Sequence, residues 1–286
     1  MSGFDDPALN DTPGYDLSRI PDSDAWQARY QRESDAVLDT LRAALDIPYA
    51  DRDPRQCLDV LPGPEGQATP AILFFHGGYW QFGGKNSRRF PAAAFHERGI
   101  AWVPANYRLT PAVELAECVA DARAAATWLY RHAESYGIDP SRIVVAGNSA
   151  GGHLTAMLLA GGWRRPYGLP ETAFDRGCPI SGLYDLAPLC ATPENAALHL
   201  DADKAARLSP RRQPLPPPSS HVTVAWGGDE TAAFEAQSQG YVEMLQTHGI
   251  AARALPLTGH DHFSVIGELG RPDSALFDGL VALTKP

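Results

Sequence analysis

The sequence predicts an α/β fold, in which a mostly parallel central sheet is covered by helices on both faces. Short apolar runs without polar alternation suit strands that are buried on both sides, and segments with helical periodicity alternate with them along the chain. The 286 residues are 44% hydrophobic and 20% charged, a composition sufficient for one large core. We therefore expect a single main domain in residues 51–286, preceded by an N-terminal arm and helix in residues 1–50.

The expected elements follow one another in a regular order. A helical pattern runs from Ala25 to Leu45, and two strand candidates follow at residues 71–75 and 100–105. A long helix is expected at residues 113–135, since its apolar positions are spaced by three and four. The remaining expectations are a strand at 142–146, a helix through 153–159, a weak strand at 178–180, short helices within 193–208, a proline-rich connector at 211–220, a strand at 221–226, a helix at 232–248, a strand at 252–256 and a closing helix at 273–283. This alternation is typical of a parallel sheet built from successive strand–helix units.

Charge and cysteine usage argue against several functional classes. Acidic residues outnumber basic ones by 34 to 24, a net charge of −10, and an acidic surface repels phosphate backbones, so we expect no nucleic-acid partner. We expect no membrane partner either, because no apolar run approaches the ~18–20 residues that span a bilayer. The first residues resemble no secretory signal. The four cysteines are far apart, which disfavours a disulfide framework and suits a reducing, cytoplasmic location.

A G-x-S-x-G motif lies between a predicted strand and a predicted helix, at residues 147–151. At such a turn the motif predicts a nucleophile elbow, in which a strained backbone lifts the Ser149 hydroxyl clear of the sheet. Gly147 and Gly151 are needed there because side chains would collide with the neighbouring strand and helix. The alternative is a glycine-rich turn in which Ser149 caps a helix.

His76-Gly77-Gly78-Tyr79-Trp80 follows an earlier predicted strand. Ester or amide hydrolysis passes through a tetrahedral oxyanion, which backbone N–H groups stabilise best where no side chain blocks their approach. The amides of Gly77 and Gly78 could supply two donors. The amide of Ala150, at the start of the helix after the nucleophile, could supply a third. The alternative is a tight glycine turn without a ligand.

A serine nucleophile needs a base, and the base needs an acid, in the chain order Ser, acid, His. The predicted strand at 221–226 leads into the adjacent carboxylates Asp229 and Glu230, and the last strand leads into His260-Asp261-His262. The residues alone do not choose between the two acids or the two histidines. The alternative is that both turns, the one with the two acids and the one with the two histidines, are simply exposed to solvent. A metal site is disfavoured because no further His or Cys pair stands at a spacing suited to metal ligands.

Together these motifs resemble a known family. HGGYW at 76–80, NYRLTP at 106–111, GNSAGGHL at 147–154 and GHDHFSV at 259–265 resemble the α/β-hydrolases of the arylformamidase (kynurenine formamidase) type, which are close to the hormone-sensitive-lipase-like carboxylesterases. The similarity extends from about residue 51 to residue 269. It implies the α/β-hydrolase fold and raises the expectation that residues 1–50 fold over the site as a cap.

The resemblance also implies roles for the catalytic candidates. Ser149 corresponds to the nucleophile, and the histidine before phenylalanine corresponds to the base, which selects His262 over His260. Counting back from Gln237 and Ser238 places the acid on Glu230, whereas the pattern of the lipase-like relatives would allow Asp229.

The resemblance extends to the substrate-binding loop. Gly77, Gly78 and Ala150 correspond to the oxyanion donors, and Tyr79 and Trp80 match the arylformamidase form of the loop, where an aromatic wall would suit an aryl substrate. The chain departs from the family at Asn148, where arylformamidases tend to have His and the lipase-like esterases Asp.

The expected function is that of a serine hydrolase. Through an acyl-enzyme, it would cleave a small acyl group from an aryl amide or ester, with no cofactor and no metal. The alternatives are a general short-chain carboxylesterase and, in another class, a catalytically silent hydrolase fold that acts as a ligand receptor. The expected partner is the small-molecule substrate, and a homodimer remains open.

Overall fold

The computed structural model describes residues 6–66 and 68–285 and contains one eight-stranded sheet. The order of the strands is β1-β2-β4-β3-β5-β6-β7-β8. β2 pairs with β1 and β4 in antiparallel fashion, and all pairs from β4 to β8 are parallel. The strands are β1 (Ala44–Pro48), β2 (Cys57–Val60), β3 (Thr69–Phe75), β4 (Ala101–Ala105), β5 (Ile138–Asn148), β6 (Arg176–Ile180), β7 (His221–Gly227) and β8 (Ala251–Leu257).

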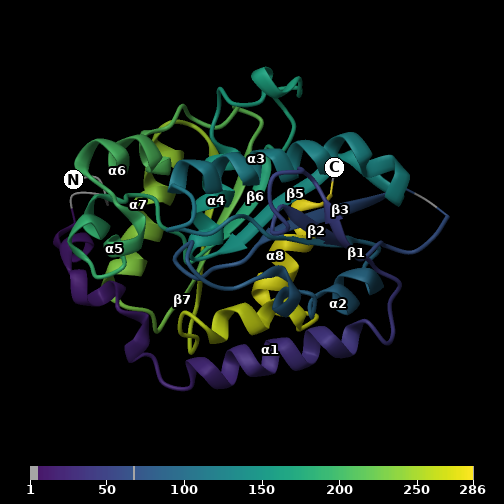
Figure 1. The fold of residues 1–286 in the computed structure, drawn as a ribbon, viewed down its shortest axis with the longest axis horizontal. Coiled ribbons are helices and arrows are strands. Elements are labelled where there is room, and N and C mark those ends of the chain that lie inside the picture. The colour runs from purple at the N-terminus through teal and green to yellow at the C-terminus, as the bar shows by residue number, and fades with distance from the viewer. Residues whose placement is uncertain (1–5, 67, 286) are drawn as a thin grey trace.

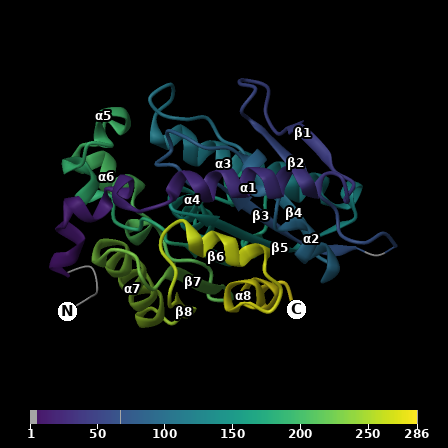
Figure 2. The same cartoon turned by 90° about the horizontal axis from the view of Figure 1, so that it is seen from below.

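Helices cover both faces of this sheet, as the sequence predicts (Figure 1). Apolar side chains of α3, α4 and α7 fill one core, and those of α1, α2 and α8 fill a second core across the sheet. The helices are α1 (Ser23–Val37), α2 (Ala92–Glu97), α3 (Leu115–His132), α4 (Ala150–Leu159), α5 (Asn195–Leu198), α6 (Ala202–Leu208), α7 (Ala232–Thr247) and α8 (Ala275–Leu283). Figure 2 shows α1 crossing in front of the strands, so the N-terminal region is part of the helical layer.

The centre of the sheet is almost entirely buried. Every residue of β3 and β4 is buried, and β5 is buried from Ile143 onward. β3 and β5 run side by side, with Phe75 paired to Gly147. Because both strands end at the same edge, the loop after β3 and the turn after β5 lie next to each other. The two glycine motifs of the sequence therefore meet at this edge.

The predicted helix over residues 25–45 is wrong at its C-terminal end. α1 stops at Val37, a turn follows, and the chain enters β1 at Ala44. Leu41 and Leu45 continue the helical spacing, but β1 is held instead by the ladder to β2 and by the amide of Asp46, which donates to Asp59. Pairing across the sheet overrides local periodicity here.

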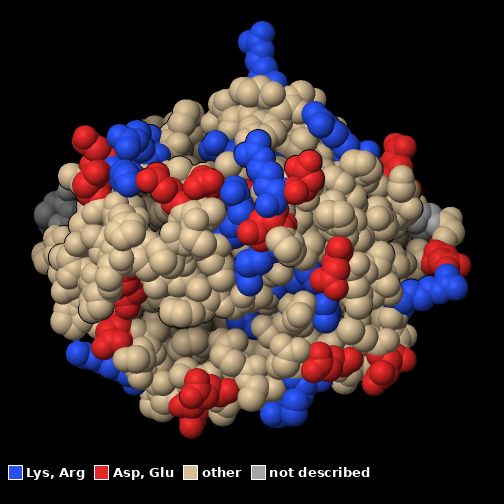
Figure 3. Space-filling model, viewed as in Figure 1, with Lys and Arg blue, Asp and Glu red and all other residues tan. Residues whose placement is uncertain are grey.

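The remaining predicted elements are present with small changes of boundary, and the proline-rich connector contains the end of the 3-10 turn Pro210–Arg212 and a second turn closed by the Ser220 amide, which donates to the carbonyl of Pro217. No helix in residues 6–66 and 68–285 is long and apolar enough to cross a membrane. Basic and acidic side chains are interspersed over the face in Figure 3.

Candidate active site

Ser149 lies at a sharp turn between β5 and α4, with φ 56° and ψ −118°. L-residues rarely adopt this region, so the surrounding structure must hold it. The flanking glycines make the turn feasible. A Cβ added at Gly151 would lie 2.0 Å from the carbonyl oxygen of Phe75, and one at Gly147 would lie 2.5 Å from the carbonyl oxygen of Gly151. The turn has the backbone geometry of a nucleophile elbow.

His262 and Glu230 form a buried pair beside this turn. Nδ1 of His262 lies 2.8 Å from Oε2 of Glu230, and the two side chains are 2% and 1% exposed. The other carboxylate oxygen of Glu230 accepts hydrogen bonds from the amide of Gly227, at 2.6 Å, and from the hydroxyl of Ser181. With both oxygens bound, the carboxylate is fixed in orientation and can hold the Nδ1–H tautomer of His262.

Asp229 does not take part in this pair. The residue is exposed, and its amide donates to the carbonyl of His260, whereas its carboxylate makes no hydrogen bond to His262. The structure therefore separates two adjacent acids that the residue pattern alone leaves equivalent.

Hydrogen bonds on both sides hold the loop that carries His262 in place. Oδ1 of Asp261 accepts hydrogen bonds from the amides of Phe263 and Ser264, at 2.8 and 2.7 Å. The hydroxyl of Tyr30, from α1, donates to the carbonyl of Phe263 at 2.6 Å. His262 thus sits on a braced turn, and the brace comes partly from the N-terminal helix.

Two reactive atoms remain without partners. Oγ of Ser149 and Nε2 of His262 are both buried and form no hydrogen bond with the described residues. Both residues line one cavity of about 370 Å³. Buried polar atoms are usually paired, so an unpaired hydroxyl and an unpaired imidazole nitrogen at one cavity are two groups that a substrate could engage. Catalytic contacts of this kind often tighten only when substrate binds.

Two of the three predicted oxyanion donors, Gly77 and Gly78, line the cavity, whereas Ala150 begins α4 directly after Ser149 and is not among the lining residues. The amide of Gly77 donates to Oδ1 of Asn148 at 3.2 Å, so it is already engaged. The amides of Gly78 and Ala150 have no acceptor within the described part of the chain. Gly78 has φ +116°, and a Cβ there would lie 2.5 Å from the carbonyl oxygen of Phe82, which explains the glycine.

Tyr79 and Trp80 follow with left-handed φ values of 49° and 57°. Tyr79 lines the cavity, and its hydroxyl donates to the carbonyl of Tyr15 at 2.6 Å. Trp80 does not line the cavity, which corrects its prediction as a substrate-binding residue. It is fully buried, packs edge-on against His153 and lies in the same apolar core as Tyr79, whose ring is 6.5 Å away.

The N-terminal region supplies part of the cavity wall. Fourteen residues line the cavity, and the sequence predicts only five of them as site residues. The lining residues are Leu17, Ser18, Ser23, Gln27, Gly77, Gly78, Tyr79, Phe82, Gly83, Arg88, Asn148, Ser149, His262 and Phe263. The first four precede β1, and no local motif marks them, since their role depends on how the chain folds back.

Hydrogen bonds fix this N-terminal wall to the hydrolytic core. The hydroxyl of Thr231 donates to the carbonyl of Gly14 at 2.7 Å, and the side-chain amide of Gln237 donates to the hydroxyl of Tyr15 at 3.0 Å. Tyr15 is itself fully buried. The segment is therefore packed against α7, in keeping with the expectation of a cap, which stays a prediction.

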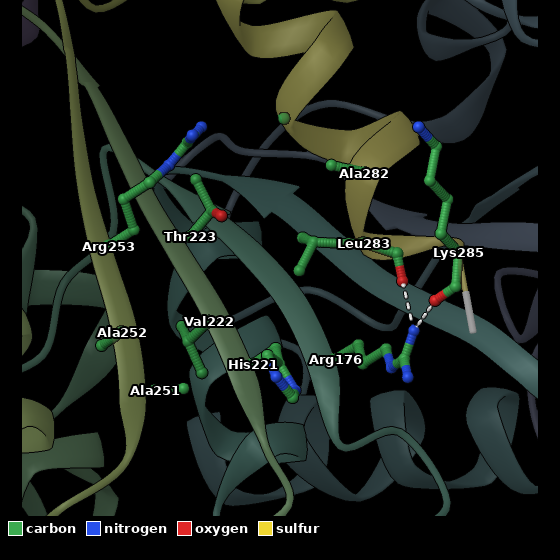
Figure 4. Close-up of a pocket in the computed structure, with 11 residues that line it drawn as sticks. Arg176, His221, Val222, Thr223, Ala251, Ala252, Arg253, Ala282, Leu283 and Lys285 are labelled. Carbon is green, nitrogen blue, oxygen red and sulfur yellow. Dashed lines mark hydrogen bonds between the residues drawn. The ribbon is translucent and has the colours of Figure 1, made fainter.

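A second cavity, of about 430 Å³, lies at the opposite edge of the sheet, where β6, β7 and β8 begin (Figure 4). Arg176 points there toward the C-terminal segment and donates to the carbonyls of Leu283 and Lys285. None of the predicted site residues lines this cavity.

No group of His, Cys, Asp or Glu side chains suited to a metal ion occurs in the described residues. His260 approaches only Glu268, at 3.8 Å, and Glu268 already pairs with Arg271. Burial lowers the pKa of His76 to about 3 and that of His153 to about 4, so both are neutral supports of the site at neutral pH.

Comparison with known proteins agrees with this fold. The chain is 32% identical to a solved structure from Silicibacter sp. tm1040, provisionally named a thioesterase, over 95% of this chain and 97% of that one, with a TM-score of 0.81. The BD-FAE family matches residues 58–164. The kynurenine formamidase of Danio rerio is 28% identical over 79% of this chain and 76% of that protein. The chain belongs to the α/β-hydrolases, in the group of hormone-sensitive-lipase-like carboxylesterases and arylformamidases.

As an α/β-hydrolase of this group, the protein is an ester or amide hydrolase of the serine-hydrolase type. A further relative is the carboxylic ester hydrolase LipM of Mycobacterium tuberculosis, 26% identical over 81% of this chain and 58% of that protein. Esterase B of Lactobacillus rhamnosis shares the fold, with a TM-score of 0.70 at 20% identity.

Proposed function

We propose that this hydrolase removes a small acyl group from an aryl amide or ester through a Ser149–His262–Glu230 triad. The observation that carries the proposal is the buried His262–Glu230 pair, which lines one cavity with the strained Ser149. An imidazole whose Nδ1–H is held by a carboxylate presents the lone pair of Nε2 to a hydroxyl proton. Oγ of Ser149 and Nε2 of His262 would exchange this proton, and neither atom forms a hydrogen bond with the described residues.

In the first half-reaction, Oγ of Ser149 attacks the acyl carbon while its proton passes to Nε2 of His262. The carbonyl electrons move onto oxygen, and the amides of Gly78 and Ala150 donate to this oxyanion. When the carbon–nitrogen or carbon–oxygen bond breaks, His262 returns the proton to the leaving aryl amine or alcohol. The acyl group remains on Ser149 as an ester.

In the second half-reaction, water attacks the acyl-enzyme. His262 takes a proton from the water, the second oxyanion forms in the same hole, and the carboxylic acid leaves as Oγ of Ser149 regains its proton. Glu230 stays ionised throughout and stabilises the imidazolium. The amide of Gly77 can join the hole only if it leaves Asn148, so Asn148 tunes the number of donors.

An arylformamidase-like substrate is favoured by two observations. The kynurenine formamidases of Danio rerio and Salmo salar are similar over 79% of this chain. The cavity is lined by the aromatic residues Tyr79, Phe82 and Phe263, which suit an aryl leaving group. The second candidate, a general short-chain carboxylesterase, is favoured by the similarity to LipM.

A substrate panel separates the two candidates. We expect higher kcat/KM for N-formylkynurenine and formanilides than for p-nitrophenyl esters, with activity falling as the acyl chain grows from formyl to butyryl. A preference for butyryl esters without formamide hydrolysis would favour the carboxylesterase. Ser149→Ala provides the background rate for every substrate in the panel.

A further inference from the structure

Arg88 places a buried positive charge at the catalytic cavity. The residue ends the short 3-10 turn Lys85–Arg88, is only 4% exposed, and lines the cavity together with Ser149 and His262. Nη1 donates to the carbonyl and hydroxyl oxygens of Ser87, and Nη2 donates to Oε1 of Gln27 at 3.1 Å. Nε is buried and has no acceptor among the described residues.

This guanidinium differs from its charged neighbours in having no carboxylate partner. Lys85 and Arg89, on the same segment, both pair with the buried Asp59, at 2.6 and 2.7 Å. Arg88 forms no salt bridge in residues 6–66 and 68–285, and no Asp or Glu lines the cavity. In a chain with 34 acidic residues, an arginine without a counter-ion beside a catalytic serine is unexpected.

The charge persists at neutral pH. Burial lowers the pKa of Arg88 to about 10, still well above the pH at which enzymes of this kind act. Its guanidinium lies over the ring of Tyr30, 5.5 Å from the centroid, which offsets only part of the lost hydration. An uncompensated buried cation is destabilising on its own, so a ligand that brings a negative charge would gain a strong partner.

We propose that Arg88 binds a carboxylate on the leaving-group side of the substrate, so that the preferred substrates are acylated aryl amines or alcohols bearing a free carboxylate. This inference rests on the hydrolysis proposed above. A guanidinium edge carrying an unused Nε–H matches the planar geometry of a carboxylate. A single cation among aromatic and small polar residues suits one negative charge better than a phosphate dianion.

The test compares substrates that differ only in this charge. The pairs are 3-acetoxybenzoate with its methyl ester, and 2-formamidobenzoate with its methyl ester. For wild-type protein and Arg88→Gln, kcat and KM are measured on each member, and the ratio of kcat/KM for acid over methyl ester is compared. We expect the ratio to fall roughly ten- to hundredfold in Arg88→Gln, mainly through KM, because a charged hydrogen bond is lost.

Arg123→Gln is the matched control. Arg123 also has a buried Nε without an acceptor and also lies over an aromatic ring, that of Trp163 at 5.7 Å, but it does not line the catalytic cavity. Its replacement should leave the ratio unchanged. If Arg88→Gln instead lowers kcat/KM equally for both members of each pair, Arg88 is only a structural support of the site and the inference is wrong.

Two further measurements keep the result decisive. If Arg88→Gln does not fold, the same ratio of kcat/KM for acid over methyl ester is measured in Arg88→Lys. This variant should still lower the ratio by at least about threefold, since lysine lacks the planar fork, and an unchanged ratio overturns the inference. If the wild type hydrolyses no member of either pair, the ratio cannot be measured, and the proposed function is judged by the substrate panel above. Binding then judges the inference separately: 3-hydroxybenzoate should raise the Tm of the wild type but not of Arg88→Gln, and equal shifts would overturn it.

Discussion

At the scale of single residues, the site depends on which of two adjacent carboxylates turns inward. The side chain of Glu230 is buried and uses both carboxylate oxygens, one toward Gly227 and Ser181 and the other toward His262. Asp229, one position earlier, is exposed. Neighbouring side chains in a turn point in different directions, so the orientation of the backbone, and not the type of acid, determines which carboxylate pairs with His262.

Removing the charge of Glu230 should therefore abolish most activity. Glu230→Gln should lower kcat by about 10³- to 10⁴-fold, because the imidazole loses the acceptor that fixes its tautomer. Asp229→Asn, the matched control, should change kcat by less than about twofold. Steady-state kinetics on a p-nitrophenyl ester measures both, and equal losses in the two variants would contradict the assignment.

Residue patterns identify some site residues and cannot identify others. The elbow at Ser149 is readable because glycine spacing and the strand-to-helix context are both local. Trp80 could not be placed from the sequence, since two adjacent aromatic residues look alike in the pattern, yet only Tyr79 reaches the cavity and Trp80 is fully buried in the core. Arg88 carries no motif at all, and its place at the cavity results from tertiary packing alone.

At the scale of elements, the N-terminal segment completes the cavity that the sheet begins. Leu17, Ser18, Ser23 and Gln27 face the catalytic residues across it. The polar character of this segment suggests a loose arm, yet Tyr15 and Tyr30 are fully buried and anchor it. Single buried tyrosines in a polar stretch give no periodic signal, so periodicity could not predict this docking.

A bulkier side chain at Leu17 should narrow the substrate range. Leu17→Trp should raise KM several-fold more for bulky aryl substrates than for small ones, because it fills part of a cavity of about 370 Å³. Arg19→Trp is the control, since Arg19 is exposed and does not line the cavity. Kinetics with phenyl acetate and naphthyl acetate tests this, and the same KM ratio in all three proteins would contradict a role for this wall.

The central strands and their helices were predictable, whereas the antiparallel edge was not. β3 contains the apolar run 71–75 and β5 the apolar run 143–146, so composition alone marks both strands. β1 is mostly half-buried or exposed and follows a helix whose apolar spacing continues into it. Its strand conformation comes from pairing with β2, which only the folded chain provides.

At the scale of the whole molecule, the parallel sheet brings distant segments to one edge. The turns after β3, β5 and β7 and the loop after β8 all leave the same side of the sheet, which places Gly78, Ser149, Glu230 and His262 together. The support beneath them includes buried neutral histidines. Chain topology thus sets both the site and part of the pH dependence of folding.

Buried His153 should make the protein less stable in acid. Its pKa is lowered by burial to about 4 in the folded chain, against about 6.5 when unfolded. Between these values only the unfolded chain takes up the proton, so the free energy of unfolding decreases as the pH falls below about 6.5.

The size of this effect can be measured by urea unfolding at pH 7 and pH 5. Over this interval the wild type should lose ~2 kcal/mol more than His153→Gln, the order expected for one histidine. Parallel pH profiles for the two proteins would show that His153 binds its proton equally well in both states.

The most direct measurement of the central claim is labelling with a fluorophosphonate, followed by mass spectrometry of the peptides. The proposed triad predicts a stoichiometric phosphonyl adduct on Ser149, slow labelling in His262→Ala and none in Ser149→Ala. An unlabelled wild-type protein, or an adduct on another residue, would contradict the assignment of Ser149 as the nucleophile.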